Sequence, residues 1–351
     1  MAILKTFGNN PAGNDLQTIK GSLNYRDGVF QNLSRTEALV KGASFLKIMW
    51  RYFTKPGNTK PPVALPSVMT NINLLKEEKP VILWFGHSSY FIQCNGKNIL
   101  VDPVFCGYAS PFSFTGKSFK GADIYSAEDF PDIDMLILTH DHYDHLDYKT
   151  VLKLQPKTKK ICTSLGVGSH LKYWGIDPAK IVEFDWWDSQ QVTEGDPAGP
   201  IELTAAPARH FSGRLFTRNK TLWSSFILKS GNYRIYIGAD SGYDSHFKMI
   251  GEKYGPFDIA MLESGQYNEY WPYIHMMPEE TVQAAADLKA KVLLPVHWGK
   301  FAISLHPWDE PIKRVIAKAS ELNVKVTTPM IGEPVILDSS YPRQQWWLTV
   351  A

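Results

Sequence analysis

The chain has 351 residues, enough for one large core or for two packed halves, so its length leaves the architecture open. Its formal net charge is only +2 at pH 7, which gives no reason to expect a nucleic-acid partner. The cysteines Cys94, Cys106 and Cys162 lack Cys-x-x-Cys spacing, so neither a disulfide framework nor a thiolate zinc site is expected, and we interpret them as buried free thiols in a reducing compartment.

The amino-terminal residues carry no targeting signal of the usual kind. A glycine, two asparagines and a proline interrupt this segment early, and it lacks the apolar core of a secretory signal. No run of about 18 apolar residues is present, so a membrane-spanning helix is not expected either. We therefore expect a cytoplasmic protein. Peripheral contact with the inner membrane surface and a homodimer are both compatible with the sequence.

Residues 1–75 differ in character from the rest of the chain, and we interpret them as an amino-terminal extension packed on a main domain at 76–351. An amphipathic stretch from Thr36 to Phe53 predicts one helix in this extension. Its apolar face includes Leu39, Phe45, Leu46 and Trp50. We expect this face to pack on the main domain; the alternative is a helix that meets a partner or a membrane surface.

From Pro80 onward the pattern becomes strand-like. The runs VILWFGH, SSYFIQC and NILVDP are short and rich in β-branched or aromatic residues, and Asn95-Gly96 predicts a hairpin turn between the last two. The nearly continuous apolar run IDMLILTH at 133–140 predicts a strand buried on both faces, with its carboxyl end at a site. A helix from about Asp147 to Leu154 should come next.

The second half has the same organisation. The runs IELTAAPARH, WSSFILKS, YRIYIGAD, PFDIAMLES and KVLLPVHW predict strands that end in polar residues. Between them, the segment 278–290 predicts a helix, with Pro278 in its first turn and acidic residues beside it. Two groups of strands with helices outside each predict an α/β protein with a four-layer αββα sandwich and an amino-terminal helical extension.

The strongest local signal lies directly after the buried run at 133–140. It is a His-x-His-x-Asp-His cluster within Thr139-His140-Asp141-His142-Tyr143-Asp144-His145-Leu146-Asp147. So many imidazoles and carboxylates would be costly to desolvate without a cation that satisfies them. On a tight loop, His140 and His142 point the same way, while Asp144 and His145 can turn to a second ion. A solvated histidine-rich loop is the alternative, which the buried strand before the cluster disfavours.

Further ligands must come from elsewhere in the chain. His210, Asp240 and His297 close three predicted strands at the same end, and this coincidence favours one shared site. One such histidine alone would more often be a structural residue. We assign His140, His142 and His210 to one ion, Asp144, His145 and His297 to the other, and Asp240 as a bridge. Imidazole and carboxylate ligands without cysteine favour two zinc ions, and they also suit iron, manganese or nickel.

The order of these residues resembles the seven-ligand dinuclear pattern of the metallo-β-lactamase superfamily. Asp102, in Leu-Val-Asp-Pro, matches the early aspartate of that family, which implies that it orients a metal ligand. His87 matches a structural motif, and we expect it to pack behind the metal ligands rather than to act directly in catalysis.

Other segments resemble the N-acyl-phosphatidylethanolamine-hydrolysing phospholipase D group and its bacterial relatives, over about residues 80 to 310. They include Trp84-Phe85-Gly86-His87-Ser88, Glu183-Phe184-Asp185-Trp186-Trp187, His275 with Pro278-Glu279-Glu280, and His297-Trp298-Gly299. The resemblance implies that Tyr143 and His275 lie beside the metals and contact the substrate phosphate. Ile274 stands where the mammalian enzyme has a polar glutamine, so the resemblance implies that one phosphate contact of that enzyme is missing here.

The resulting hypothesis is a hydrolase of phosphodiesters, such as an N-acyl phospholipid. Two metal ions would bridge a water and supply hydroxide to attack phosphorus, with His275 or Tyr143 neutralising charge on the phosphate. Asp144 and Asp240 would hold the ions and could receive the proton of the nucleophile. A lactonase or another ester or amide hydrolase is the alternative on the same site. A protein that binds metal or ligand without catalysis is the alternative from another class.

Overall fold

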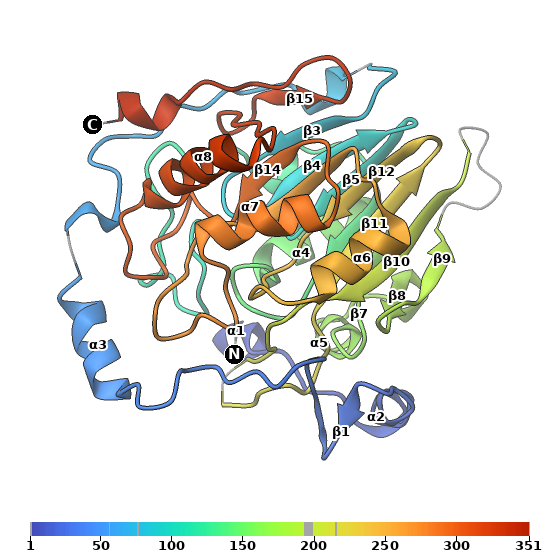
Figure 1. Cartoon of the computed structure of the whole chain (residues 1–351). Coiled ribbons are helices and arrows are strands. Elements are labelled where there is room, and N and C mark those ends of the chain that lie inside the picture. The colour runs from blue at the N-terminus through green and yellow to red at the C-terminus, as the bar shows by residue number, and fades with distance from the viewer. Residues whose placement is uncertain (1, 56, 76, 193–198, 215, 351) are drawn as a thin grey trace.

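Two mixed β-sheets stack face to face at the centre of the molecule (Figure 1). The computed structural model describes residues 2–55, 57–75, 77–192, 199–214 and 216–350. The first sheet has the order β15-β3-β4-β5-β6-β7-β8, and the second has the order β14-β13-β12-β11-β10-β9. The strands of the first are β3 (Val81–Trp84), β4 (Tyr90–Cys94), β5 (Lys97–Val101), β6 (Ile133–Leu138), β7 (Thr158–Ser164), β8 (Ile181–Phe184) and β15 (Pro334–Ile336). Those of the second are β9 (Ser189–Gln191), β10 (Ile201–Pro207), β11 (Ser224–Ser230), β12 (Tyr233–Ile237), β13 (Ile259–Glu263) and β14 (Leu293–Val296).

Successive side chains along a strand point to opposite faces of its sheet, so each strand contributes to two apolar layers. In β3, Ile82 and Trp84 face the space between the sheets, where they join residues such as Phe226 of the second sheet in one buried cluster. Val81 and Leu83 of the same strand face the other way, into a cluster that contains helical residues. Both faces of this sheet are therefore covered.

Helices cover the outer face of each sheet, so the predicted αββα sandwich is confirmed (Figure 1). The outer face of the first sheet packs on α4 (Tyr148–Leu154) and α5 (Gly168–Tyr173). The outer face of the second packs on α6 (His246–Tyr254), α7 (Pro278–Asp287) and α8 (Glu310–Leu322). No helix in the described ranges is both long and apolar enough to span a bilayer.

Local signals in the sequence correspond to the observed boundaries. Asn95 and Gly96 both have positive φ and join β4 to β5 as an antiparallel hairpin. Asp147 caps α4 by accepting a hydrogen bond from the backbone N–H of Lys149. The helix predicted over 278–290 ends earlier, at Asp287, because Lys289 has a left-handed backbone (φ 56°) that a continuing helix cannot accommodate.

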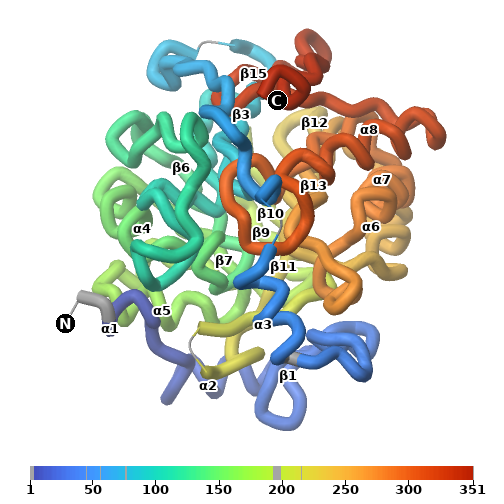
Figure 2. Tube along the Cα trace, turned by 90° about the vertical axis from the view of Figure 1, so that its left-hand side faces the viewer, coloured from blue at the N-terminus to red at the C-terminus, as the bar shows by residue number. Residues whose placement is uncertain are grey.

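The amino-terminal segment runs around the sandwich and contains α1 (Ala2–Thr6), α2 (Gly13–Lys20), the hairpin of β1 (Tyr25–Arg26) and β2 (Val29–Phe30), and α3 (Phe45–Phe53). In Figure 1 it passes along the bottom of the molecule from α2 and β1 to α3 at the left, and in Figure 2 α3 lies at the front. Its buried side chains include Ile19, Phe30, Leu65 and Ile72.

The predicted helix from Thr36 to Phe53 is shorter than expected. The helix α3 begins only at Phe45, because Gly42 adopts positive φ and Ser44 then caps the helix. The expected packing of its apolar face is wrong for Leu46 and Trp50, which are 81% and 69% exposed. Residues 36–44 run over the main domain instead, where the N–H of Val40 donates to the carbonyl of Tyr270. The segment before the helix is therefore attached to the main domain through its backbone, without a contribution from Leu46 or Trp50.

Candidate metal centre

Polar residues at the ends of several strands meet at one edge of the two sheets. The loop after β6 carries the His-x-His-x-Asp-His cluster, and the chain reaches the same place after β3, β10, β12 and β14. The residues brought together there are His87, His140, His142, Asp144, His145, His210, Asp240 and His297. All seven residues assigned as ligands from the sequence are among them.

The first group of potential ligands is formed by His140, His142, His210 and Asp240, whose ligand atoms all lie within 4.8 Å of one another. Nδ1 of His142 is 2.9 Å from Nε2 of His140 and 3.2 Å from Nε2 of His210. These are the three histidines assigned to one ion, and the aspartate assigned as a bridge is beside them.

The second group contains Asp144, His145 and His297, and His87 joins them. Asp240 reaches this group as well, with Oδ2 at 3.2 Å from Nε2 of His145 and Oδ1 at 3.1 Å from Nδ1 of His297. The aspartate thus lies between both groups, as a bridging ligand would. Nε2 of His87 shares a hydrogen bond of 2.9 Å with Oδ2 of Asp144, so this histidine supports a proposed ligand directly.

The chemistry of these side chains fits a pair of cations. Burial lowers the pKa of His140, His210 and His297 well below the ordinary value, which keeps the imidazoles in the neutral form that binds metals. Among the described residues, Nε2 of His145 and Oδ1 of Asp240 are buried without a hydrogen-bond partner. Buried polar atoms are rarely left without one. Bound cations would satisfy both atoms.

Backbone hydrogen bonds hold together the two loops that carry His87 and His297. The N–H of His297 donates to the carbonyl of His87, and the N–H of His87 donates to the carbonyl of Trp298, both at 2.8 Å. Both histidines have positive φ, 53° and 66°, which is uncommon for residues with a side chain and is typical of functional sites. The loops after β3 and β14 thus fix each other.

Asp102, the residue after β5, forms hydrogen bonds to two residues of the His-x-His-x-Asp-His loop. Its Oδ1 accepts the N–H of Thr139 at 2.8 Å, and its Oδ2 lies 2.8 Å from Nδ1 of His145. This leaves Nε2 of His145 to face Asp240. The position agrees with the orienting role that the resemblance implies.

We expect Asp102→Asn to weaken metal affinity by about 10- to 100-fold, because an amide cannot accept from Thr139 and His145 together. Competition titration with a chelator would measure the change. Asp134→Asn, at a carboxylate that pairs with Lys159, is the matched control. Equal affinity in the two variants would contradict the orienting role of Asp102.

A cavity of about 320 Å³ opens above the two groups. His142, Asp144, Asp240 and His297 contribute polar atoms to its wall. The rest of the wall is mostly apolar and includes Leu39, Ile48, Phe211, Trp271, Ile274 and Ile303. A bound molecule would therefore place a polar group at the candidate metals and an apolar part against the remaining wall.

The two predicted substrate contacts lie in different places. His275 lines the cavity, with its ring centroid 5.0 Å from that of His210. Tyr143 is not among the described residues that line it; its ring lies 4.1 Å from the guanidinium carbon of Arg214. Ile274 both lines the cavity and contributes its backbone carbonyl, which accepts from Nδ1 of His210 at 2.7 Å and leaves Nε2 for a metal.

Sequence reasoning missed Glu263, the buried carboxylate that contacts His275. It closes the apolar run of β13, much as Asp240 comes after that of β12, so the same signal could have found it. It also missed Arg218, Gln266 and Trp271 of the cavity wall, which lie in loops that no local pattern connects to the cluster.

The stability of the metal-free protein should fall as the pH drops from about 6.5 to about 4. Burial lowers the pKa of every histidine except His145; that of His87 and that of His142 fall from 6.5 to about 4. The unfolded chain then binds more protons in this window, so stability is lost as the pH falls. Burial raises the pKa of Asp240 to about 6, and the pKa values of Glu183, Glu263, Glu280 and His145 are raised too, but the nine histidines with lowered pKa outnumber these five opposing groups. Melting curves at pH 7.5 and 5 with a chelator should show a lower Tm at pH 5; an unchanged Tm would contradict the prediction.

The chain is similar in sequence and in fold to known proteins. Residues 97–298 match the family model described as Beta-lactamase superfamily domain. An uncharacterized protein of Mycobacterium tuberculosis is 36% identical, over 98% of this chain and 94% of that protein. The N-acyl-phosphatidylethanolamine-hydrolyzing phospholipase D 1 of Caenorhabditis elegans is 31% identical, over 71% of this chain and 74% of that protein. Among solved structures, the metallo hydrolase Igni18 of Ignicoccus hospitalis has a similar fold, with a TM-score of 0.57, 20% identity, and coverage of 75% of this chain and 100% of that one.

Proposed function

The chain belongs to the metallo-β-lactamase superfamily as a metal-dependent hydrolase, and from this premise we propose that it is a dinuclear phosphodiesterase of the phospholipase D type. Its substrate would be an N-acyl phospholipid or a related lipid phosphodiester. The observation that carries the proposal is the position of Asp240 between two groups of ligands at the base of a largely apolar cavity. The similarity to the phospholipase D of Caenorhabditis elegans supports the choice of reaction.

We assign one ion to His140, His142 and His210 and the other to Asp144, His145 and His297, with Asp240 shared. Two divalent ions at these positions, zinc in our proposal, would stabilise charge on a phosphate and acidify water. Asp144 and Asp240 would hold the ions, and their carboxylates would serve as acceptors for a proton from water. His275 contacts the phosphate from the cavity wall.

The polar and apolar parts of the cavity fit a lipid phosphodiester. Arg218 lines the wall as well, and its guanidinium supplies positive charge for a phosphate. The apolar side chains, such as Trp271 and Ile303, are suited to hydrocarbon and exclude water from the reacting group.

The helix α3 beside the cavity supports a lipid substrate and a peripheral contact with a membrane. Ile48 faces the cavity, whereas Leu46, Trp50 and Phe53 recur on another face at helical spacing and are 81%, 69% and 77% exposed. From Ala38 to Lys76 the chain has no acidic residue, and its six basic residues are Lys41, Lys47, Arg51, Lys55, Lys60 and Lys76. An exposed apolar stripe with basic residues suits an anionic lipid surface.

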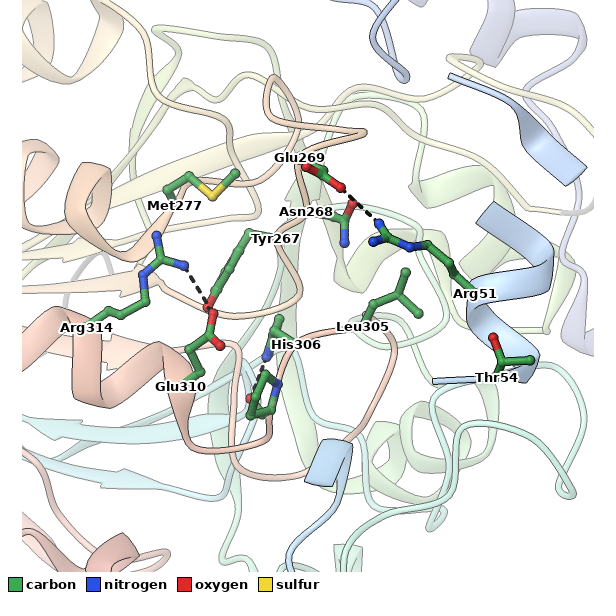
Figure 3. Close-up of a pocket in the computed structure, with 11 residues that line it drawn as sticks. Arg51, Thr54, Tyr267, Asn268, Glu269, Met277, Leu305, His306, Glu310 and Arg314 are labelled. Carbon is green, nitrogen blue, oxygen red and sulfur yellow. Dashed lines mark hydrogen bonds and ion pairs between the residues drawn. The ribbon is translucent and has the colours of Figure 1, made fainter. Parts of the chain in front are cut away.

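A second cavity, of about 620 Å³, shows how α3 is held. Arg51 and Thr54 of the helix line it (Figure 3). Nη1 of Arg51 donates to Oε1 of Glu269 at 2.9 Å and lies 3.0 Å from the hydroxyl oxygen of Tyr270. In Figure 3, Arg51 extends from α3 toward the loop that carries Glu269. These contacts attach the helix to the main domain by a polar side chain and leave its apolar stripe outside.

The test of the proposal combines metal analysis with a substrate screen. Purified protein should contain two metal ions per chain and hydrolyse phosphodiesters, N-acyl phospholipids among them, and His142→Ala should abolish this activity. Activity on lactones or other esters with none on phosphodiesters would select the alternative hydrolase. Metal without hydrolysis of any of these classes would select a binding protein.

A further inference from the structure

Glu263, the last residue of β13, is a buried carboxyl group that contacts His275, a residue of the cavity wall. Its side chain is 1% exposed, and Oε2 lies 2.6 Å from Nδ1 of His275. Its other oxygen, Oε1, accepts the backbone N–H groups of Met276 at 2.8 Å and Ser241 at 3.1 Å. One carboxylate therefore connects His275 with the segment directly after Asp240.

Both carboxyl oxygens of Glu263 have hydrogen-bond partners. The hydrogen bond to Nδ1 of His275 determines the orientation of that ring. A buried carboxyl group is costly unless it is fully hydrogen-bonded, so rotating the ring of His275 away would leave Oε2 without a partner. Burial raises the pKa of Glu263, but the short hydrogen bond holds the ring whichever atom carries the shared proton. Nδ1 is therefore occupied, and Nε2 is the ring nitrogen that remains available.

The available nitrogen belongs to a ring at the candidate metal centre. His275 lines the cavity, and its ring centroid is 5.0 Å from that of His210 and 5.3 Å from that of His297. Asp240, Glu263, His275 and His297 also form a group whose ligand atoms lie within 4.8 Å of one another. A phosphate bound to metal ions at Asp240 and His297 would thus lie beside the imidazole of His275, which Glu263 contacts.

We propose that Glu263 is the positioning residue that fixes His275, so that Nε2 of His275 faces the phosphate of a substrate at the metal centre. This inference rests on the proposed function and adds one residue to it. Glu263 does not touch the substrate. Its effect passes through His275, in the way that a carboxylate behind a histidine fixes the ring and its hydrogen-bonding nitrogen.

The test uses the metal-loaded protein and inorganic phosphate as the probe. Glu263→Asp keeps a carboxyl group but withdraws it from Nδ1 of His275. We expect Glu263→Asp and His275→Ala each to weaken phosphate binding by about 10-fold or more, with metal content unchanged. The double variant should bind phosphate no more weakly than His275→Ala alone, because both changes remove one contact. Isothermal titration calorimetry would measure the affinities.

Glu280→Asp is the matched control. Glu280 is a nearby acid whose Oε2 accepts the N–H of Met277 at the start of α7, and the partner of His275 is Glu263 instead, so phosphate binding should not change. Multiplying effects in the double variant would overturn the inference, because they would mean that Glu263 and His275 act separately. Loss of metal in Glu263→Asp but not in His275→Ala would also overturn the inference. It would mean that Glu263 acts by holding the segment of Asp240 in place and not by positioning His275.

A measurement on the unaltered protein covers the case in which Glu263→Asp does not fold. In protein labelled with ¹⁵N-histidine, a spectrum of His275→Ala assigns the ring signals of His275. A slowly exchanging, downfield proton shared between Nδ1 and the Glu263 carboxyl group should appear, and a freely exchanging proton at this position would contradict the inference. If the wild-type protein cleaves no phosphodiester but the coupling in phosphate binding is found, the proposed function fails and the inference stands. Phosphodiester hydrolysis without the coupling means that only the inference fails.

Discussion

Asp240→Asn should abolish hydrolysis, with a fall in kcat/KM on the order of 10³-fold or more, since several kcal/mol of charge stabilisation by the metals would be lost. The reason is geometric. Asp240 belongs to the first group and also approaches the second, with Oδ2 at 3.7 Å from Nε2 of His210 and at 3.2 Å from Nε2 of His145. An amide carries no charge and cannot bridge two cations as a carboxylate does. Metal analysis should therefore show fewer than two ions per chain.

Asp258→Asn provides the control for this variant. Asp258 directly precedes β13, at the end of the strand away from Glu263, and it pairs with Lys291 at 2.7 Å. We expect wild-type metal content and activity for Asp258→Asn. Full activity of Asp240→Asn with two ions retained would contradict the assignment of Asp240 as a bridging ligand, and it would leave the proposed mechanism without its central residue.

The second large effect concerns α3. The variant with Leu46→Ser and Trp50→Ser should bind anionic vesicles about 100-fold more weakly than the wild type. Burying an apolar side chain of this size in lipid contributes about 1.5 to 3 kcal/mol, which is tenfold or more for each residue. Hydrolysis of a lipid phosphodiester in vesicles should fall accordingly. Hydrolysis of a short, water-soluble phosphodiester should not change, because neither residue lines the cavity among the described residues.

Vesicle sedimentation would measure this binding, with phosphatidylglycerol vesicles compared with phosphatidylcholine vesicles. Leu322→Ser, at the end of α8 and 38% exposed, is the control for removing an exposed leucine. Equal binding to both lipids would exclude the contribution of the basic residues around α3. Unchanged binding by the double variant would exclude α3 as the lipid surface. A change of oligomeric state in the double variant, with lipid binding intact, would assign the apolar stripe to contact between copies of the chain.

The sequence alone was sufficient for the fold class and for the set of polar residues that the structure brings together at the candidate metal centre. Strand periodicity, the Asn95-Gly96 turn and the helical segments are local properties, and each is fixed by residues close together in the chain. The candidate ligands could be assigned to one site because His210, Asp240 and His297 each come after the carboxyl end of a predicted strand. The histidine cluster likewise comes after the carboxyl end of β6. Strands in one sheet bring such ends to a common edge, so order along the chain was enough.

Contacts between distant segments decided the rest. Nothing close in the sequence relates Glu263 to His275, or the carbonyl of Ile274 to His210, because these contacts depend on how the loop after β13 folds back over the sheet edge. The amphipathic pattern of α3 gave the helix but not the surroundings of its apolar face, since periodicity is the same whether that face meets a core or solvent. Only the tertiary structure determines that Ile48 faces the cavity and Trp50 the outside, because Arg51 is held by Glu269 on the opposite loop.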